Sequence, residues 1–168
     1  MRTARGTVRT GTAVLAVLTA ALAGPGPEGG RVDGFTIGHV PAALAQGAEV
    51  EASETSYEWG GARFTARMWE RALSGGGFRV ELQVLVVRGE ALSDLREVRA
   101  FLSEYHGHPW AVGDLEEFDH GGAPGYMGTL EAFWLHEPGV AVEVRDSAGV
   151  LGPGELRRTA LGVRPADD

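Results

Sequence analysis

The stretch FRVELQVLVV, residues 78–87, decides the fold that we predict from the sequence. Apolar and polar residues alternate along most of it, which is the period of a β-strand with one face on a core. The apolar set is Phe78, Val80, Leu82, Val84 and Val86. Residues 62–71 alternate in the same way, and the glycine-rich residues 74–77 between the two stretches favour a hairpin.

Trp69 falls on the polar face of the first of these strands, between Arg67 and Arg71. This arrangement predicts an arginine stacked on the indole ring at the surface of the sheet. The alternative is that Trp69 offers a flat platform to a ligand.

Residues 93–106 follow the hairpin and carry the signals of a helix. Ser93 can cap its start, Asp94 suits the positive end of the helix dipole, and Gly107 suits the position after its last turn. We expect one apolar face of this helix to cover the sheet. The residues of that face are Leu95, Val98, Phe101, Leu102 and Tyr105.

A second hairpin and a second helix are expected after a polar loop. Residues 126–135 form the first strand of this hairpin, Pro138 and Gly139 suit a type II turn, and alternating valines in 140–144 form the return strand. Residues 153–161 are predicted as a short helix. Its inner side would hold Leu156, Ala160 and Val163.

These elements predict an α+β protein, with an antiparallel sheet of about five to six strands and two helices packed on one face. The single domain would span residues 35–165, with a short edge strand at 35–37 and a solvated loop or edge strand at 46–56. Residues 24–34 are rich in glycine and proline and are expected to form a flexible linker.

The first 23 residues have the layout of a secretory signal peptide. Arg2, Arg5 and Arg9 precede an uncharged apolar run, and Ala21-Leu22-Ala23 is a small-x-small cleavage site. The run is shorter than the roughly 20 residues of a bilayer span. We therefore expect export and secretion; the alternative is an uncleaved signal that anchors the chain in the membrane.

The composition narrows the classes of function. The chain of 168 residues has no cysteine, which excludes disulfides, thiolate metal sites and a cysteine nucleophile. Its formal net charge is −8, and loss of the three leader arginines would make it −11. An acidic protein is disfavoured as a partner of nucleic acid or of an anionic membrane. After cleavage we expect no stable membrane insertion.

The histidines offer the one candidate for a metal site. His106, His108 and His120 lie near several acidic residues, and imidazole nitrogens suit zinc. Their spacing matches no specific metal signature. The alternative is a solvated polar loop, with His106 at a helix C-terminus where a protonated ring complements the dipole. No metal or cofactor is therefore assigned.

Enzyme motifs give no catalytic residue. The chain has no G-x-S-x-G sequence, and its glycine pairs lack the spacing of a nucleotide-binding loop. Pairs of carboxylates suited to glycoside hydrolysis stay possible because acids are numerous. Four further aromatic residues could line a pocket, although aromatic residues in strands mostly pack in cores. They are Trp59, Trp110, Phe133 and Trp134.

The C-terminal third carries a resemblance to a known group of proteins. A strand ending in Phe133-Trp134, a Pro-Gly turn, a return strand and a helix entered at Glu155-Leu156 follow one another. This order resembles the uncharacterised extracytoplasmic α+β domains of high-GC Gram-positive bacteria, some of them attached to anti-sigma-factor-like membrane proteins. The resemblance implies an exported, non-catalytic accessory or sensory module. It assigns no functional residue.

The sequence thus favours a secreted binding or interaction module of the cell envelope, with a protein or another envelope component as its partner. One alternative is a small hydrolase or metal-dependent enzyme without a recognisable motif. The other is a structural envelope protein held by its N-terminal signal.

Overall fold

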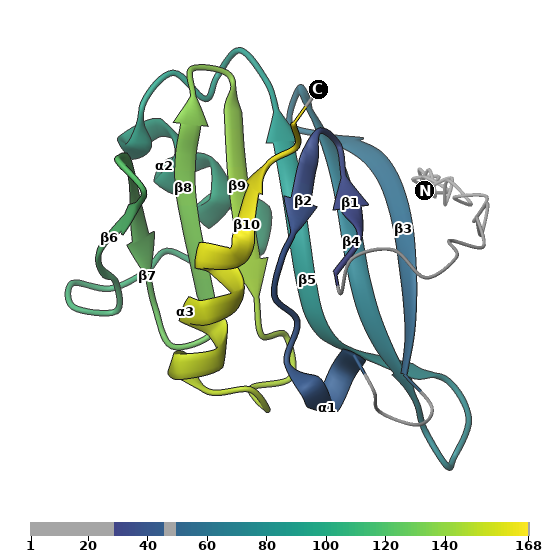
Figure 1. Ribbon diagram of the computed structural model, residues 1–168. Coiled ribbons are helices and arrows are strands. Elements are labelled where there is room, and N and C mark those ends of the chain that lie inside the picture. The colour runs from purple at the N-terminus through teal and green to yellow at the C-terminus, as the bar shows by residue number, and fades with distance from the viewer. Residues whose placement is uncertain (1–28, 46–49, 168) are drawn as a thin grey trace, which may run out of the picture.

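A seven-stranded antiparallel sheet forms the centre of the protein (Figure 1). The computed structural model describes residues 29–45 and 50–167, so the expected signal peptide lies outside the described residues. In spatial order, the strands are β3 (Val50–Trp59), β4 (Ala62–Ala72), β5 (Phe78–Arg88), β9 (Val140–Arg145), β8 (Glu131–Glu137), β7 (Ala123–Met127) and β6 (Glu116–His120).

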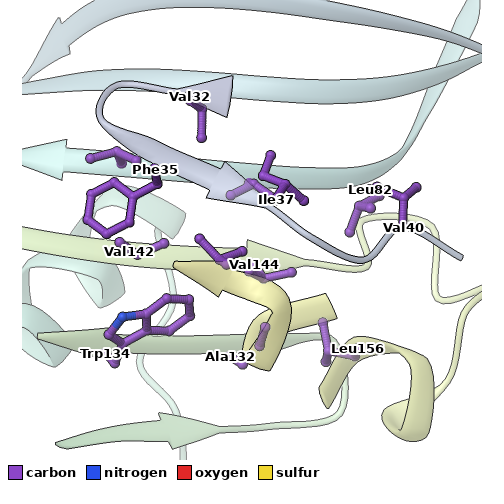
Figure 2. Close-up of a cluster of buried hydrophobic side chains, with 14 of the residues drawn as sticks. Val32, Phe35, Ile37, Val40, Leu82, Ala132, Trp134, Val142, Val144 and Leu156 are labelled. Carbon is purple, nitrogen blue, oxygen red and sulfur yellow. The ribbon is translucent and has the colours of Figure 1, made fainter. Parts of the chain in front are cut away.

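A small second sheet covers one face of the large one. It has the order β1–β2–β10, formed by Arg31–Val32, Phe35–Ile37 and Val163–Pro165, and lies in front of the large sheet in Figure 1 together with helix α3 (Pro153–Gly162). The short helix α1 (Ala42–Ala45) follows β2. Figure 2 shows the apolar side chains that fill the space between these layers, here called the first core. Its members include Val32, Ile37, Leu82, Trp134, Val142, Leu156 and Ala160.

Helix α2 (Leu95–His106) belongs to a second core on the opposite face of the large sheet. Phe133 and Trp134 are neighbours in β8 and both are fully buried, yet Phe133 belongs to the second core and Trp134 to the first. The sheet is therefore buried on both sides along its middle strands. The prediction of an α+β protein is confirmed, whereas the prediction that both helices cover one face is wrong.

The two predicted helices form close to their expected bounds. Val98 and Leu102 of α2 are buried in the second core, and Leu156 and Ala160 of α3 in the first. The cap of α2 differs by one residue from the prediction, because the Asp94 carboxylate, not Ser93, accepts the hydrogen bond from the Glu97 backbone N–H at 2.9 Å. Among the described residues, no helix is both long and apolar enough to cross a bilayer.

A β-bulge corrects the predicted face of strand β5. Trp69 pairs with Leu82 and Glu70 pairs with Val80, which leaves Glu81 as an extra residue. An extra residue reverses the face on which the preceding residues lie. Leu82, Val84 and Val86 are therefore buried in the first core as predicted, whereas Phe78 is 61% exposed.

Glu81 is buried at this bulge by two arginines. Arg71 donates to its carboxylate from Nε at 2.8 Å, and Arg79 forms a second ion pair with it. The hydrogen bond from Arg71 is the main reason that the pKa of Glu81 lies below its usual value. The bulge thus buries a carboxylate between two arginines that stay partly exposed, and such pairing is the condition for tolerating a buried charge.

The strand count also differs from the prediction. The polar loop before residue 126 contains β6 and the start of β7, and the predicted strand 126–135 is broken at Gly128 into β7 and β8. The prediction for residues 46–56 left a solvated loop and an edge strand as alternatives. Residues 50–59 form the edge strand β3. Of the expected linker, residues 31–32 form β1, and residues 24–28 lie outside the described part.

Candidate functional site

Strand β3 forms one edge of the large sheet and is the longer of that sheet's two edge strands (Figure 1). All ten of its residues pair with β4, and no described strand pairs with its other side. The opposite edge strand, β6, has five residues. An edge strand directs half of its backbone N–H and C=O groups away from the sheet. β3 therefore offers a long row of unpaired backbone groups.

The two faces of β3 differ in chemistry. Tyr57 and Trp59 are half-buried and pack against the second core. Glu54, Ser56 and Glu58 alternate with them and are exposed on the other face. Arg67 and Arg63 lie opposite these two glutamates in β4, but Arg63 pairs with Asp33 and Arg67 lies over the ring of Trp69. Among the described residues, no ion pair involves Glu54 or Glu58, so both carboxylates can accept a cation from outside.

Aromatic rings hold β3 against helix α2. The rings of Tyr57 and Phe64 stack with their centroids 5.1 Å apart. The indole of Trp59 contacts Phe101 and Tyr105 of α2 edge-to-face, at centroid distances of 5.3 and 5.4 Å. Such pairs add to the stability that burial gives. These contacts fix the position of β3 relative to β4 and α2.

A polar cluster lies beneath the C-terminal end of α2. The hydroxyls of Tyr57 and Tyr105 are 2.6 Å apart, and burial raises the pKa of Tyr57 above its usual value. Next to this pair, His106 lies between Glu143 and Arg145 of β9, at 2.8 and 3.1 Å. Glu143 is fully buried, and its second oxygen has no hydrogen-bond partner among the described residues.

This cluster fixes the helix to the sheet. An arginine has only donors, so Arg145 donates to Nδ1 of His106, and the ring donates from Nε2 to Glu143. Both ring nitrogens are then in use. His106 therefore has no free ring nitrogen for a metal ion.

The structure separates the three histidines of the candidate metal site. The rings of His106 and His108 lie 6.1 Å apart on the side of the second core. His120 lies on the other face, where its ring stacks on Trp134 at 4.0 Å and its Nε2 donates to the Ala160 carbonyl at 3.0 Å. Among the described residues, no group of three or more His, Cys, Asp or Glu side chains is placed to hold a metal ion.

Two open hollows lie at the surface of the described residues near side chains of interest. One, of about 350 Å³, is lined by Trp59, Gly60, Ala91, Glu97, Ala100, Phe101 and Glu104, beside the end of β3. Another, of about 460 Å³, lies between the turns after β6 and β8 and the end of β10, and is lined in part by His120, His136 and Arg164.

The remaining aromatic candidates are mostly structural. Trp69 is buried in the first core, so its predicted position on the polar surface of the sheet is wrong and it is no ligand platform. The guanidinium of Arg67 does lie over its ring, 5.6 Å from the centroid. Phe133 and Trp134 are buried, and Trp110 donates from Nε1 to Glu131 at 2.8 Å. Trp59 lines the hollow beside the end of β3. The alternation of polar and aromatic residues in 54–59 is a strand signal that the prediction for residues 46–56 did not use.

Comparisons of the chain with protein-family models, with curated proteins and with solved structures found no match.

Proposed function

We propose that the protein is an exported, non-catalytic binding module of the cell envelope that takes an extended segment of a partner protein as an added strand along β3. The observation that carries the proposal is the ten-residue open edge of β3, supported from behind by Tyr57 and Trp59. Addition of a strand to an open edge is a general mode of peptide recognition, in which backbone hydrogen bonds give affinity and alternate side chains give specificity.

Charge defines the chemistry of the partner segment. Residues of an added strand that lie opposite Glu54 and Glu58 would meet two unpaired carboxylates, so arginine or lysine is favoured there. Residues on the alternate positions would lie beside Tyr57 and Trp59, where apolar side chains are favoured. The segment is therefore basic on one face and apolar on the other.

The same charges disfavour pairing between two copies of this chain. A second β3 would bring its own glutamates to the edge, and like charges on adjacent strands are destabilising. The net charge of −8 adds a general repulsion between copies. Charged side chains on an edge strand are a common way to prevent such self-association. The edge would thus stay open until a basic partner arrives.

The test uses short synthetic peptides and the purified domain. A peptide in which Arg and Val alternate should bind about tenfold more tightly than one in which Glu and Val alternate, as measured by isothermal titration. The double variant Glu54→Gln with Glu58→Gln should remove most of this preference. Glu116→Gln with Glu117→Gln is the matched control, because it makes the same charge change on the opposite edge strand.

Backbone methylation separates strand addition from simple charge attraction. N-methyl groups on one set of alternate residues of the Arg–Val peptide should abolish binding, and those on the other set should leave it intact, because only one side of the added strand faces β3. Equal binding of both methylated peptides, or equal affinity for the Arg and Glu peptides, would refute the proposal.

Export is tested on the protein from its native cells. An N-terminus at Gly24 in the exported form, found by mass spectrometry, supports a free secreted protein. An intact Met1 in the membrane fraction supports the anchored alternative. Full-length product confined to the cytosol would refute the export part of the proposal.

A further inference from the structure

We infer that the hollow between β3 and α2 is a binding subsite for one cationic side chain, arginine or lysine, of the segment that adds to β3. This inference rests on the proposed function for its biological partner, but the subsite itself can be tested without a peptide. The hollow has a volume of about 350 Å³ and begins at Trp59, the last residue of the edge strand. The alternate residue of an added strand that lies beside Trp59 would be next to its opening, so this one position is the exception on the otherwise apolar face of the segment.

The walls of the hollow combine aromatic rings with carboxylates. Trp59 and Phe101 line it, and their rings are held edge-to-face at 5.3 Å. Glu97 and Glu104 line it as well, about two turns apart on α2, and its lining contains no basic side chain. An aromatic face attracts a cation, and tryptophan is the best of the aromatic side chains for this. The long methylene stem of arginine or lysine would pack against the rings at the same time.

Glu104 is the carboxylate that would meet the cation. Glu97 already accepts a hydrogen bond from Arg96 at 2.9 Å. Glu104 is exposed, and none of the ion pairs of the described residues involves it. A guanidinium can approach the indole and still donate to a carboxylate, since its donors lie in the plane of the group.

Gly60 keeps the hollow open. Its φ of +59° favours glycine, and a Cβ built on it would lie 3.1 Å from the ring of Phe101. Any larger residue at this position would therefore enter the space beside Phe101. The chain thus turns away after Trp59 without filling the space beside Phe101 that the cationic side chain would enter.

The test uses a small probe, Nα-acetyl-arginine amide, with Nα-acetyl-citrulline amide as its uncharged isostere. The arginine probe should shift the indole N–H resonance of Trp59 in NMR spectra, and the citrulline probe should not. The Trp59 resonance is assigned by its loss in Trp59→Phe. Glu104→Gln should weaken the arginine probe about threefold, which is the size of one exposed cation–π or charge contact.

Glu90→Gln is the matched control, because Glu90 is an exposed acid outside the lining of this hollow. Equal shifts with both probes, or unchanged affinity in Glu104→Gln, would overturn the inference. The two proposals fail separately. If arginine placed at each valine position of the Arg–Val peptide in turn never binds more tightly than citrulline at the same position, the subsite is refuted and strand addition stands. If the arginine probe binds at Trp59 but the peptide does not bind, strand addition is refuted and the subsite stands.

Discussion

His106 Nε2 lies 2.8 Å from Oε1 of Glu143, which joins the last residue of α2 to a fully buried carboxylate in β9. The side chain of His106 is itself only 5% exposed. The pair therefore holds one end of the helix on the sheet, directly behind the aromatic residues that support β3. The geometry of the proposed binding edge depends on it.

Replacement of His106 by alanine is expected to lower the free energy of unfolding by about 2–4 kcal/mol, because it removes the hydrogen bond to the buried Glu143 carboxyl group and leaves only Arg145, at 3.8 Å, beside it. Urea denaturation measures this loss. His108→Ala is the control, since His108 is exposed and should change the stability by less than about 0.5 kcal/mol. Equal stabilities of the two variants would show that the buried pair contributes nothing.

His120 should make the stability depend on pH. Burial lowers its pKa from the usual 6.5, so the unfolded chain binds the proton more readily than the folded one. The contribution of His120 is therefore complete above the unfolded pKa, near 6.5, and is lost as the pH falls towards the folded pKa. We expect the free energy of unfolding to decrease between about pH 7.5 and pH 5.5.

The variant His120→Phe keeps a ring stacked on Trp134 but removes the titrating group. In this variant the free energy of unfolding should change less with pH between about pH 5.5 and pH 7.5, whatever its value at neutral pH. His136→Phe is the control, because His136 is only half-buried. The window lies above the range in which Glu81 and Glu155 titrate, since their pKa values are lowered from 4.5. An unchanged slope in His120→Phe would contradict the prediction.

The bulge at Glu81 predicts opposite outcomes for two apolar residues of the same strand. Leu82→Ala should cost about 2–5 kcal/mol, because Leu82 is fully buried in the first core. Phe78→Ala should cost less than about 0.5 kcal/mol, because Phe78 is 61% exposed. Thermal and urea unfolding measure both. A large loss in Phe78→Ala would mean that the uninterrupted alternation of the sequence describes the strand better than the bulge does.

Gly125 should tolerate no side chain. A Cβ on it would lie 2.4 Å from the Phe133 carbonyl oxygen and 2.8 Å from Cβ of Trp134, so β7 and β8 would have to separate. Gly125→Ala is expected to destabilise the protein by about 1–3 kcal/mol or more. Gly75→Ala is the control, because no atom lies within 4 Å of a Cβ there. Equal melting temperatures for the two variants would contradict the close approach.

The features predicted correctly were those with strong local periodicity. The apolar face of α2, the inner residues of α3 and the strands around residues 62–87 follow directly from spacing. The errors arise where a non-local pairing decides. The bulge at Glu81 depends on ion pairs with Arg71 and Arg79, which no alternation pattern reveals. Strand β6 is mostly acidic and polar, and β7 contains proline and glycine, so both form through pairing with their neighbours in the sheet rather than through propensity.

The candidate site was harder to predict than the fold. The sequence drew attention to histidines that lie close together along the chain, but the sheet separates His106 from His120. The aromatic residues that support β3 come from distant parts of the chain. Tyr57 contacts Tyr105 and Trp59 contacts Phe101, and each pair is separated by more than forty positions in the sequence. Such contacts arise only once the helix is placed on the sheet.

The small sheet β1–β2–β10 has a consequence for the order in which the molecule matures. Strand β2 pairs with β1 on one side and with β10, the last strand, on the other, and the first core contains Val32 and Val163 together. Residues 35–37 therefore have their second partner strand only once residues 163–165, more than 120 positions further along the chain, are available. Closure of this interior is thus a late folding event, and loss of either end of the described chain would open the same layer.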